Sequence, residues 1–470
     1  MGLYNLLNSV QIAVFGGTYD VYLDWVGQII KFLITSVGSV GVGIILFSLV
    51  LKIVVLPFDV YQRISMRKQN IKMKENQARM EKLQKQYANN KELYNQKVME
   101  MYKESGISMF SSCLPMILSM VIFFVAIGAF NAYSQYSNIE NYNTMVEAYN
   151  AKILEYVPDL DMDALDNGTI TISEYSKEEV IGEETITKNY VRVESTDSAK
   201  CVYVEVLKAD DVTFETDAQR LEYVLTIEID KKAYFVDVDR AVAAGYITSE
   251  MTEEEIRAHF EGLAQDNVLK TYNEKVLPNT QFIWIKNIWV TDASYTHPVL
   301  EYSNFKTEVS RENFDVNGSK VSLTGISAKT NAYEKETYNK VTAKLSTQKA
   351  EGNGWFILIA LSILTILLQQ WVSNRAQKEQ QKYSTVDGQG ASQQKMTMII
   401  MTGMFAVFSF MYSSAFAIYL IVSNVFSLAS TIIINKAVDV AAEKAELKAM
   451  QAKYNKRFPG AKQDGENKKK

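Results

Sequence analysis

The sequence predicts a mainly α-helical polytopic membrane protein with five transmembrane helices, a cytoplasmic helical hairpin and an extracellular α+β insert. The first observation behind this prediction is five apolar stretches, each long enough to cross ~30 Å of hydrocarbon as a helix. The second is the charge: the 470 residues have a net charge of −5, yet residues 131–353 contain 22 basic and 39 acidic residues. The rest of the chain contains 27 basic and 15 acidic residues, and this separation by segment indicates two compartments.

The chain begins with an amphipathic N-terminal segment, residues 1–29, which precedes the first transmembrane helix, residues 30–58. The segment lacks a basic region and an evident cleavage site, so we expect an interfacial helix rather than a signal peptide. The apolar part of the first span, residues 32–57, contains one charge, Lys52. Because a charge costs roughly 2.5–3.5 kcal/mol at the centre of a membrane helix, we expect Lys52 to face water or an acidic partner. Pro57 is expected to kink or end the helix.

Residues 59–106 are predicted to form a basic helical hairpin in the cytoplasm. Residues 60–105 include 11 basic and 5 acidic residues, with apolar residues at helical spacing on both sides of Asn89 and Asn90. That pair is a turn signal, and Gly106 is expected to end the hairpin. The alternative is a solvated, salt-bridged pair of helices without a partner. The second transmembrane helix, residues 107–135, contains Pro115, which membrane helices tolerate.

Residues 136–280 are predicted to form a small extracellular α+β domain. Residues 191–194, 201–207, 223–229 and 234–238 have the alternation or apolar runs of strands. Thr252 and Glu255 have the spacing of a capping box, which begins a helix with Ile256, Phe260 and Leu263 on one face. The domain has no nucleotide-binding loop, metal-ligand spacing or catalytic triad. Since 2 cysteines and 2 histidines are too few for a disulfide framework or a zinc site, we predict no metal and no cofactor.

Residues 281–353 are predicted to be an extracellular interfacial segment and linker, because residues 281–290 are rich in Trp and Ile, which suit the membrane–water interface. The third to fifth transmembrane helices follow in residues 354–436, with a cytoplasmic loop at 373–395. Residues 437–470 form a basic cytoplasmic tail. Because basic loops stay in the cytoplasm, the N-terminus and the insert are expected outside.

Polar residues occur toward the cytoplasmic ends of three predicted spans. These are Lys52 in the first span, Gln369 and Gln370 in the third, and Ser423 and Asn424 in the fifth. Polar side chains at a shared depth can line a water-filled cavity. Two alternatives are that the neutral residues hydrogen-bond between helices, and that Lys52 extends to the headgroups.

Seven short motifs lie in a defined order relative to the spans. They are LKIVVLP (51–57), SMRK (65–68), MYKESGIS (101–108), CLPM (113–116), FIWIKNIW (282–289), LLQQ (367–370) and IYLIVSN (418–424). With this pattern the chain resembles the bacterial YidC membrane-protein insertases of the Gram-positive type, with an enlarged extracellular insert. The resemblance implies five core helices around a hydrophilic groove that opens to the cytoplasm and to lipid. It implies these substrate-binding groove residues: Lys52, Gln369, Gln370, Tyr419, Ser423 and Asn424.

The chain departs from the family pattern at several positions. Lys52 stands where the family usually has Arg, which keeps the charge but loses the bidentate fork. Met109 replaces a usual Pro, and Ser119 and Val121 stand where Gln and Pro are common. Residues 412–415 read YSSA instead of FPAG, and Leu420 replaces the Trp of a Tyr-Trp pair.

From these observations we predict a membrane protein insertase and chaperone that performs no covalent chemistry and is not an enzyme. The implied partners are nascent membrane proteins, the ribosome and anionic lipids, with the Sec translocon as a further candidate. We do not expect the protein to bind DNA. Contacts with ribosomal RNA or lipid are predicted for basic residues of the tail: Lys453, Lys456, Arg457, Lys462, Lys468, Lys469 and Lys470. The predicted localisation is the bacterial cell membrane, in several passes, with a cytoplasmic C-terminus.

Two other classes of protein are considered. A Ser/Lys peptidase would pair Ser48 with Lys52, one helical turn apart on the same face. A transporter or receptor would use the extracellular domain to sense a ligand. Transporters usually contain internal repeats with broken helices, and the sequence has no such repeat.

Overall fold

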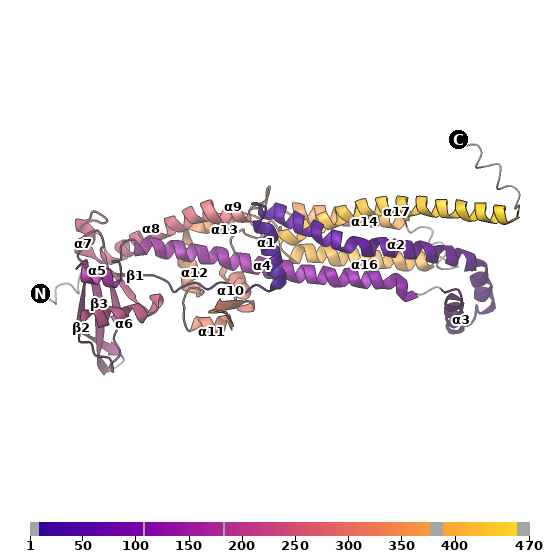
Figure 1. Cartoon of the computed structure of the whole chain (residues 1–470). Coiled ribbons are helices and arrows are strands. Elements are labelled where there is room, and N and C mark those ends of the chain that lie inside the picture. Colours follow the sequence, from indigo (N-terminus) through magenta and orange to yellow (C-terminus); the bar gives the residue numbers. More distant parts are fainter. Residues whose placement is uncertain (1–8, 107–108, 182–183, 377–388, 458–470) are drawn as a thin grey trace, which may run out of the picture. The chain divides into compact units, whose positions relative to one another are not determined.

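The computed structural model describes residues 9–106, 109–181, 184–376 and 389–457. The chain divides into two compact units, and each is made of segments far apart in the sequence (Figure 1). A helical unit comprises Ile29–Asn131, Thr291–Ala293 and the chain from Gly354 onward. An α+β unit comprises Ala132–Val290, Ser294–Asn353 and the N-terminal residues up to Gln28.

The helical unit contains the long apolar helices and the polar helix α3. Its helices are α1 (Trp25–Thr35), α2 (Val40–Gln86), α3 (Lys91–Glu104), α4 (Met109–Leu154) as far as Asn131, α14 (Ile357–Ala376), α16 (Gln389–Met411) and α17 (Ser414–Arg457). Three stretches of the described chain are long and apolar enough to cross a membrane: Val40–Gln86, Ile357–Arg375 and Ser414–Ala452. The other two predicted spans fall in α4 and α16, where some side chains lie outside the described part, so five crossings stay a prediction. The predicted fold class, a mainly helical membrane protein with a small sheet in an insert, is confirmed.

The first predicted span requires a correction, because two helices replace one. α1 ends at Thr35 and α2 begins at Val40, with Gly38 between them at φ +67°. A left-handed glycine is a common end to a helix. Gly43 then lets α2 approach α1, since a Cβ at this position would lie 2.5 Å from Cα of Ile34. Pro57 does not end the helix, and α2 continues through it to Gln86.

The predicted hairpin is confirmed in the last part of α2 and in α3. The Asn90 side chain caps α3 by accepting a hydrogen bond from the Leu93 backbone N–H at 3.0 Å. Met80 and Met101 are buried between the two helices, and the Tyr102 hydroxyl donates to the Met80 sulfur at 3.3 Å. Gly106 follows with a positive φ of 63°.

The α+β unit is built on a five-stranded antiparallel sheet in the order β1-β5-β4-β3-β2. The strands are β1 (Ser9–Ile12), β2 (Ile170–Ile181), β3 (Glu184–Ser195), β4 (Val202–Leu207) and β5 (Ala233–Asp237). Three of the four predicted strands are confirmed by β3, β4 and β5, although Cys201 and Val238 fall just outside β4 and β5. The fourth, residues 223–229, is wrong because helix α6 (Asp217–Thr226) occupies its first half. Thr216 and Gln219 form a capping box that begins this helix, and Leu221 and Val224 are buried at helical spacing.

The predicted structure of the N-terminal segment also requires a correction. Residues 9–12 form a strand, where the sequence had predicted an interfacial helix. Val10 pairs with Val236 of β5 and Ile12 with Tyr234, and all four side chains are buried. The alternation of Val10 and Ile12 has the period of a strand with one buried face.

Residues 281–353, predicted as an interfacial segment and linker, are a third correction, because all of them except Thr291–Ala293 belong to the folded α+β unit and do not form a linker. Ile288 and Trp289 are buried, and Asn287 and Asn353 exchange side-chain-to-backbone hydrogen bonds of 2.8 and 2.7 Å. Helix α10 (Tyr302–Arg311) contributes Phe305 to the main hydrophobic core. The other helices of this unit are α5 (Met162–Asp166), α7 (Val238–Ala243), α8 (Glu253–Thr271), α9 (Leu277–Thr280), α11 (Leu323–Ser327), α12 (Lys335–Val341) and α13 (Ser346–Ala350). Helix α8 begins with the predicted capping box.

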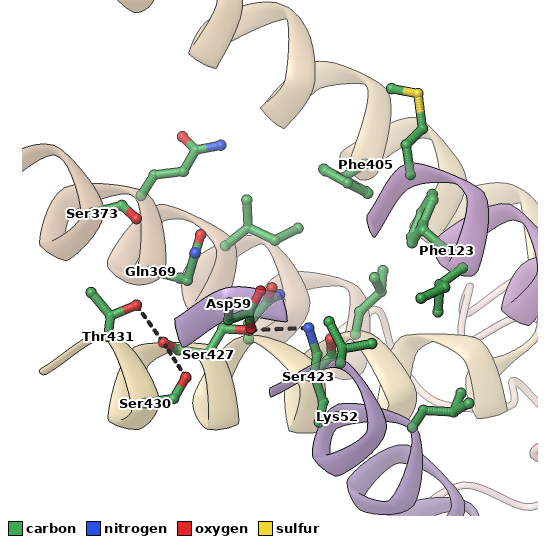
Figure 2. Close-up of a pocket in the computed structure, with 18 of the residues that line it drawn as sticks. Lys52, Asp59, Phe123, Gln369, Ser373, Phe405, Ser423, Ser427, Ser430 and Thr431 are labelled. Atoms are coloured by element: carbon green, nitrogen blue, oxygen red, sulfur yellow. Dashed lines mark hydrogen bonds between the residues drawn. The ribbon is translucent and has the colours of Figure 1, made fainter. Parts of the chain in front are cut away.

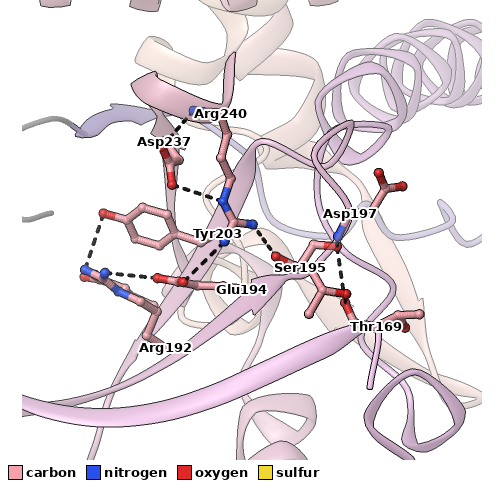
Figure 3. A network of polar contacts seen from close by, with 10 residues as sticks. Thr169, Arg192, Glu194, Ser195, Asp197, Tyr203, Asp237 and Arg240 are labelled. Carbon is pink, nitrogen blue, oxygen red and sulfur yellow. Dashed lines mark hydrogen bonds and ion pairs between the residues drawn. The ribbon is translucent and has the colours of Figure 1, made fainter. Parts of the chain in front are cut away.

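A buried ion pair joins two strands of the sheet. Arg192 on β3 lies directly opposite Glu205 on β4, and their side chains are 2.7 Å apart with little exposure. Figure 3 shows Arg192 with two further partners, the Glu194 carboxylate at 3.1 Å and the Tyr203 hydroxyl. The Arg192 guanidinium also lies over the rings of Tyr203 and Tyr175, at 4.2 and 4.9 Å. A slip of one residue in the strand register would leave a buried charge without its partner, so this pair favours the observed register.

Candidate functional site

A polar cavity of about 350 Å³ lies within the helical unit. Five helices line it: α2, α4, α14, α16 and α17 (Figure 2). Its polar lining residues are Lys52, Asp59, Gln62 and Arg63 of α2; Gln369, Gln370 and Ser373 of α14; and Tyr419, Ser423, Asn424, Ser427, Ser430 and Thr431 of α17. The cavity volume could hold several water molecules, given ~30 Å³ for each in the liquid.

All six residues predicted for a groove line this one cavity. These residues are Lys52, Gln369, Gln370, Tyr419, Ser423 and Asn424. They come from three helices, and the first and the last of them are 372 positions apart in the chain. The structure therefore brings the predicted set together in one cavity.

Helices α2 and α17 are connected by side-chain hydrogen bonds along their length. The Lys52 ammonium donates to the Ser427 hydroxyl at 3.1 Å. Farther along, Arg63 donates to the Asn435 side-chain oxygen at 3.0 Å and also to the Thr431 hydroxyl. Contact positions increase along both helices together, so the two helices run parallel and Lys52 is held against α17 by a neutral partner.

On the opposite side of the cavity, amides connect α14 to its neighbours. The Gln370 side-chain oxygen accepts a hydrogen bond from Thr402 of α16 at 2.9 Å. The Asn424 side chain of α17 donates to Thr365 of α14 at 3.5 Å. The alternative that these amides hydrogen-bond between helices is thus also correct for Gln370 and Asn424, which line the cavity as well.

Apolar side chains from α4 and α16 complete the lining. Phe123 of α4 and Phe405 of α16 meet edge to face with ring centroids 4.9 Å apart. Met120 and Met404 extend this apolar wall. The cavity therefore has one side rich in hydrogen-bonding groups and one side suited to an apolar chain.

The structure does not pair Ser48 with Lys52, as the peptidase alternative requires. The Ser48 hydroxyl is buried and donates to the Ile44 carbonyl of its own helix at 2.6 Å. Ser48 is not among the described residues that line the cavity, whereas Lys52 is. A Ser/Lys dyad requires the two side chains to share a hydrogen bond, and here Lys52 donates to Ser427 instead.

Sequence reasoning missed Asp59 and Arg63 as cavity residues. They follow Lys52 by seven and eleven positions, which places all three on one face of a continuous helix. This spacing was a signal in the sequence, but it places the residues on one face only if the helix continues past Pro57.

The predicted contacts of the basic tail fall outside the described side chains. Lys453, Lys456 and Arg457 end α17 with side chains outside the described part, and Lys462 and Lys468–Lys470 lie outside the described residues.

Comparison with known proteins assigns the helices to a family. The sequence model described as "60Kd inner membrane protein" matches residues 32–171 and 267–443, which is more than half of the chain. The chain belongs to this family. Every residue that lines the cavity falls within the matched parts.

Several relatives of this family member carry the name "Membrane protein insertase YidC". The protein from Caldanaerobacter subterraneus is 34% identical over 113 residues, which is 24% of this chain and 53% of the relative. The Fusobacterium nucleatum protein is 34% identical over 105 residues, 22% of this chain and 49% of the relative. The Enterococcus faecalis protein is 35% identical over 111 residues, 23% of this chain and 38% of the relative. The chain thus spans about half the length, or less, of the curated relatives it matches, and no solved structure gives a significant match.

The matched parts of this family member leave out most of the sheet. Residues 172–266 include β3, β4 and β5, and residues before 32 include β1. Both unmatched parts meet in one sheet, since β1 pairs with β5. The cavity therefore lies in the family-matched part of the chain, and most of the sheet lies outside it.

Proposed function

We propose that this protein is a membrane protein insertase and chaperone for newly made membrane proteins. The observation that carries the proposal is the polar cavity, which lies within the family-matched helices and is lined by all six predicted groove residues. The names of the relatives support the same activity. They do not favour a transporter or a receptor with an extracellular ligand-sensing domain.

The mechanism follows from the two sides of the cavity. A polar segment that enters lipid without hydrogen bonds loses several kcal/mol for each unsatisfied group. The hydroxyl and amide groups of α14 and α17 offer it partners, so the barrier falls. The attached apolar segment gains ~0.8 kcal/mol for each CH₂ buried in lipid, and this burial drives the process without a cofactor.

The proposed topology places the basic hairpin and tail in the cytoplasm and the α+β unit outside. In this arrangement the cavity opens to the cytoplasm and to lipid. The positive charge of the hairpin and the long apolar stretches of α2, α14 and α17 support it. The proposed partners are nascent membrane proteins, the ribosome, anionic lipids and, as a further candidate, the Sec translocon.

Reconstitution tests the activity directly. The purified full chain is placed in lipid vesicles, and a single-span substrate with a short neutral tail is synthesised in their presence. Protease protection of the tail inside the vesicles should exceed that in protein-free vesicles. Equal protection in both would contradict the proposal.

The tail of the chain is proposed to contact ribosomal RNA or anionic lipid through phosphates. Deletion of residues 453–470 should weaken ribosome binding in a salt-sensitive way while leaving the protein in the membrane. Ribosome co-sedimentation at low and moderate salt is the measurement. A result identical to that of the full chain at both salt concentrations would mean that these residues do not bind the ribosome.

A further inference from the structure

The charges in the cavity come from one helix and have both signs. Among the described lining residues only Lys52, Asp59 and Arg63 are charged, and all three belong to α2 (Figure 2). The α14 and α17 residues that face them are neutral amides and hydroxyls. A substrate segment in the cavity would therefore meet a negative charge as well as a positive one.

The three charges differ in how they are held. Lys52 donates to Ser427 at 3.1 Å, and Arg63 donates to Asn435 at 3.0 Å. Asp59 lines the cavity and makes no direct hydrogen bond or ion pair within 4.0 Å to a described residue, although the charges of Lys52 and Arg63 attract it. Asp59 is thus the charged group of the cavity that is available to an incoming side chain.

Asp59 forms no direct ion pair with Lys52, although the two charges attract each other. Seven residues of helix separate the two by about 10.5 Å along the axis. An extended polypeptide covers that distance in about three residues, at ~3.4 Å each. Lys52 and Asp59 can therefore act on different residues of one segment, an acidic one and a basic one.

From this geometry we infer that Asp59 sets the charge selectivity of the cavity: its carboxylate receives lysine or arginine side chains of the substrate segment and disfavours acidic ones. The inference rests on the proposed function and deepens it. Without Asp59, the two cations Lys52 and Arg63 would make the cavity selective for acidic segments, because cations in a low-dielectric wall repel other cations. Asp59 extends the accepted segments to those with basic residues.

The test uses the full chain in vesicles without a membrane potential, since a potential would itself move charged tails. Three substrates share one apolar span and have short tails that are neutral, lysine-containing or glutamate-containing. Protease protection is compared for the parent, Asp59→Asn, Asp59→Glu and a control, Asp439→Asn. Asp439 is a suitable control because its carboxylate pairs with Arg67 at 2.5 Å and does not line the cavity.

Asp59→Asn should lower insertion of the lysine tail about fivefold, which is the effect expected from one partly screened charge pair. It should raise insertion of the glutamate tail and change insertion of the neutral tail by less than that of either charged tail. Asp59→Glu should restore the parent pattern, and Asp439→Asn should not alter it. An equal loss for all three tails, or no change for any of them, would overturn the inference while the neutral tail still reports the proposed activity. Failure of the parent with every tail would overturn both.

Discussion

At the scale of single residues, Lys52 is a cation with a neutral partner. Its ammonium donates to Ser427, and apolar residues occupy the next four positions of α2. Arg63 and Arg67 on the same helix have more extensive partners, Thr431 with Asn435 and Asp439 respectively. The difference leaves the charge of Lys52 able to attract an acidic substrate residue.

The charge of Lys52, rather than its shape, should matter for acidic tails. Lys52→Arg is expected to retain activity. Lys52→Ala and Lys52→Glu should impair substrates with acidic translocated tails far more than substrates with neutral tails. Protease protection at matched protein levels measures this, and equal insertion of an acidic tail by Lys52→Glu and the parent would mean that Lys52 only reaches the headgroups.

Asp292 is a second residue of interest, because its side chain caps the first turn of α14. Its carboxylate accepts a hydrogen bond from the Ile359 backbone N–H at 2.9 Å, at the first turn of α14, and the residue is buried. Burial raises the pKa of Asp292 from 3.8 to about 6, although the hydrogen bond from Ile359 acts in the opposite direction. A raised pKa in the folded state means that the stabilising contribution is complete below pH ~3.8 and is lost as pH rises through about 6.

Thermal unfolding in detergent between pH 5 and pH 8 should therefore show a decrease in stability with pH that depends on Asp292. Asp292→Asn keeps an acceptor for Ile359 and cannot ionise, so it should remove this decrease and be more stable than the parent at pH 8. Asp292→Ala should cost about 1 kcal/mol at pH 5, because it removes the cap. A parent and an Asp292→Asn variant with parallel pH profiles would exclude this role.

At the scale of elements, β1 is a short strand that pairs with β5, which lies far from it in the sequence. Val10, Ile12, Val14 and Phe15 are buried in the core of the α+β unit. Each buried side chain of this size contributes about 1.5–3 kcal/mol. The N-terminal strand is thus a substantial part of the stability of this unit, and the predicted boundaries of 136–280 exclude it.

A fragment of residues 132–353 should accordingly be stabilised by a peptide of residues 9–24. Saturating peptide should raise the midpoint of thermal unfolding by several degrees, since about 1 kcal/mol corresponds to 2–4 °C for a domain of this size. Circular dichroism measures the midpoint. A peptide with Val10→Lys and Ile12→Lys is the control, and an equal shift with both peptides would show that β1 pairing is not responsible.

At the scale of the whole molecule, the cavity and the sheet belong to different parts of the chain. The cavity lies in the helical unit and in the family-matched residues, and residues 172–266 lie outside the match. We propose that the insert serves a partner or a late folding step rather than insertion itself.

Replacement of residues 172–266 by a short Gly/Ser linker should leave insertion of a simple single-span substrate largely intact. This deletion keeps α4, Asp292 and every residue that lines the cavity. Protease protection of the substrate tail is the measurement, with the amount of protein in the membrane matched to the parent. Complete loss of insertion by a stably folded deletion variant would contradict the separation of roles.

The sequence by itself determined the features that depend on neighbours along the chain. Apolar length predicted the membrane helices, helical spacing with Asn89 and Asn90 predicted the hairpin, and Thr252 with Glu255 predicted the start of α8. These signals act within one or two helical turns, so they can be read locally.

Only the tertiary structure decided which distant segments meet. The short apolar alternation of the N-terminal segment also suited an interfacial helix. The segment is a strand because Val10 pairs with Val236 of β5. Asp59 and Arg63 join Lys52 in the cavity because α2 continues through Pro57 beside α17, which lies about 370 residues later. The physical reason is that strand pairing and cavity lining are made by contacts across the fold, where local propensity gives no information about the partner.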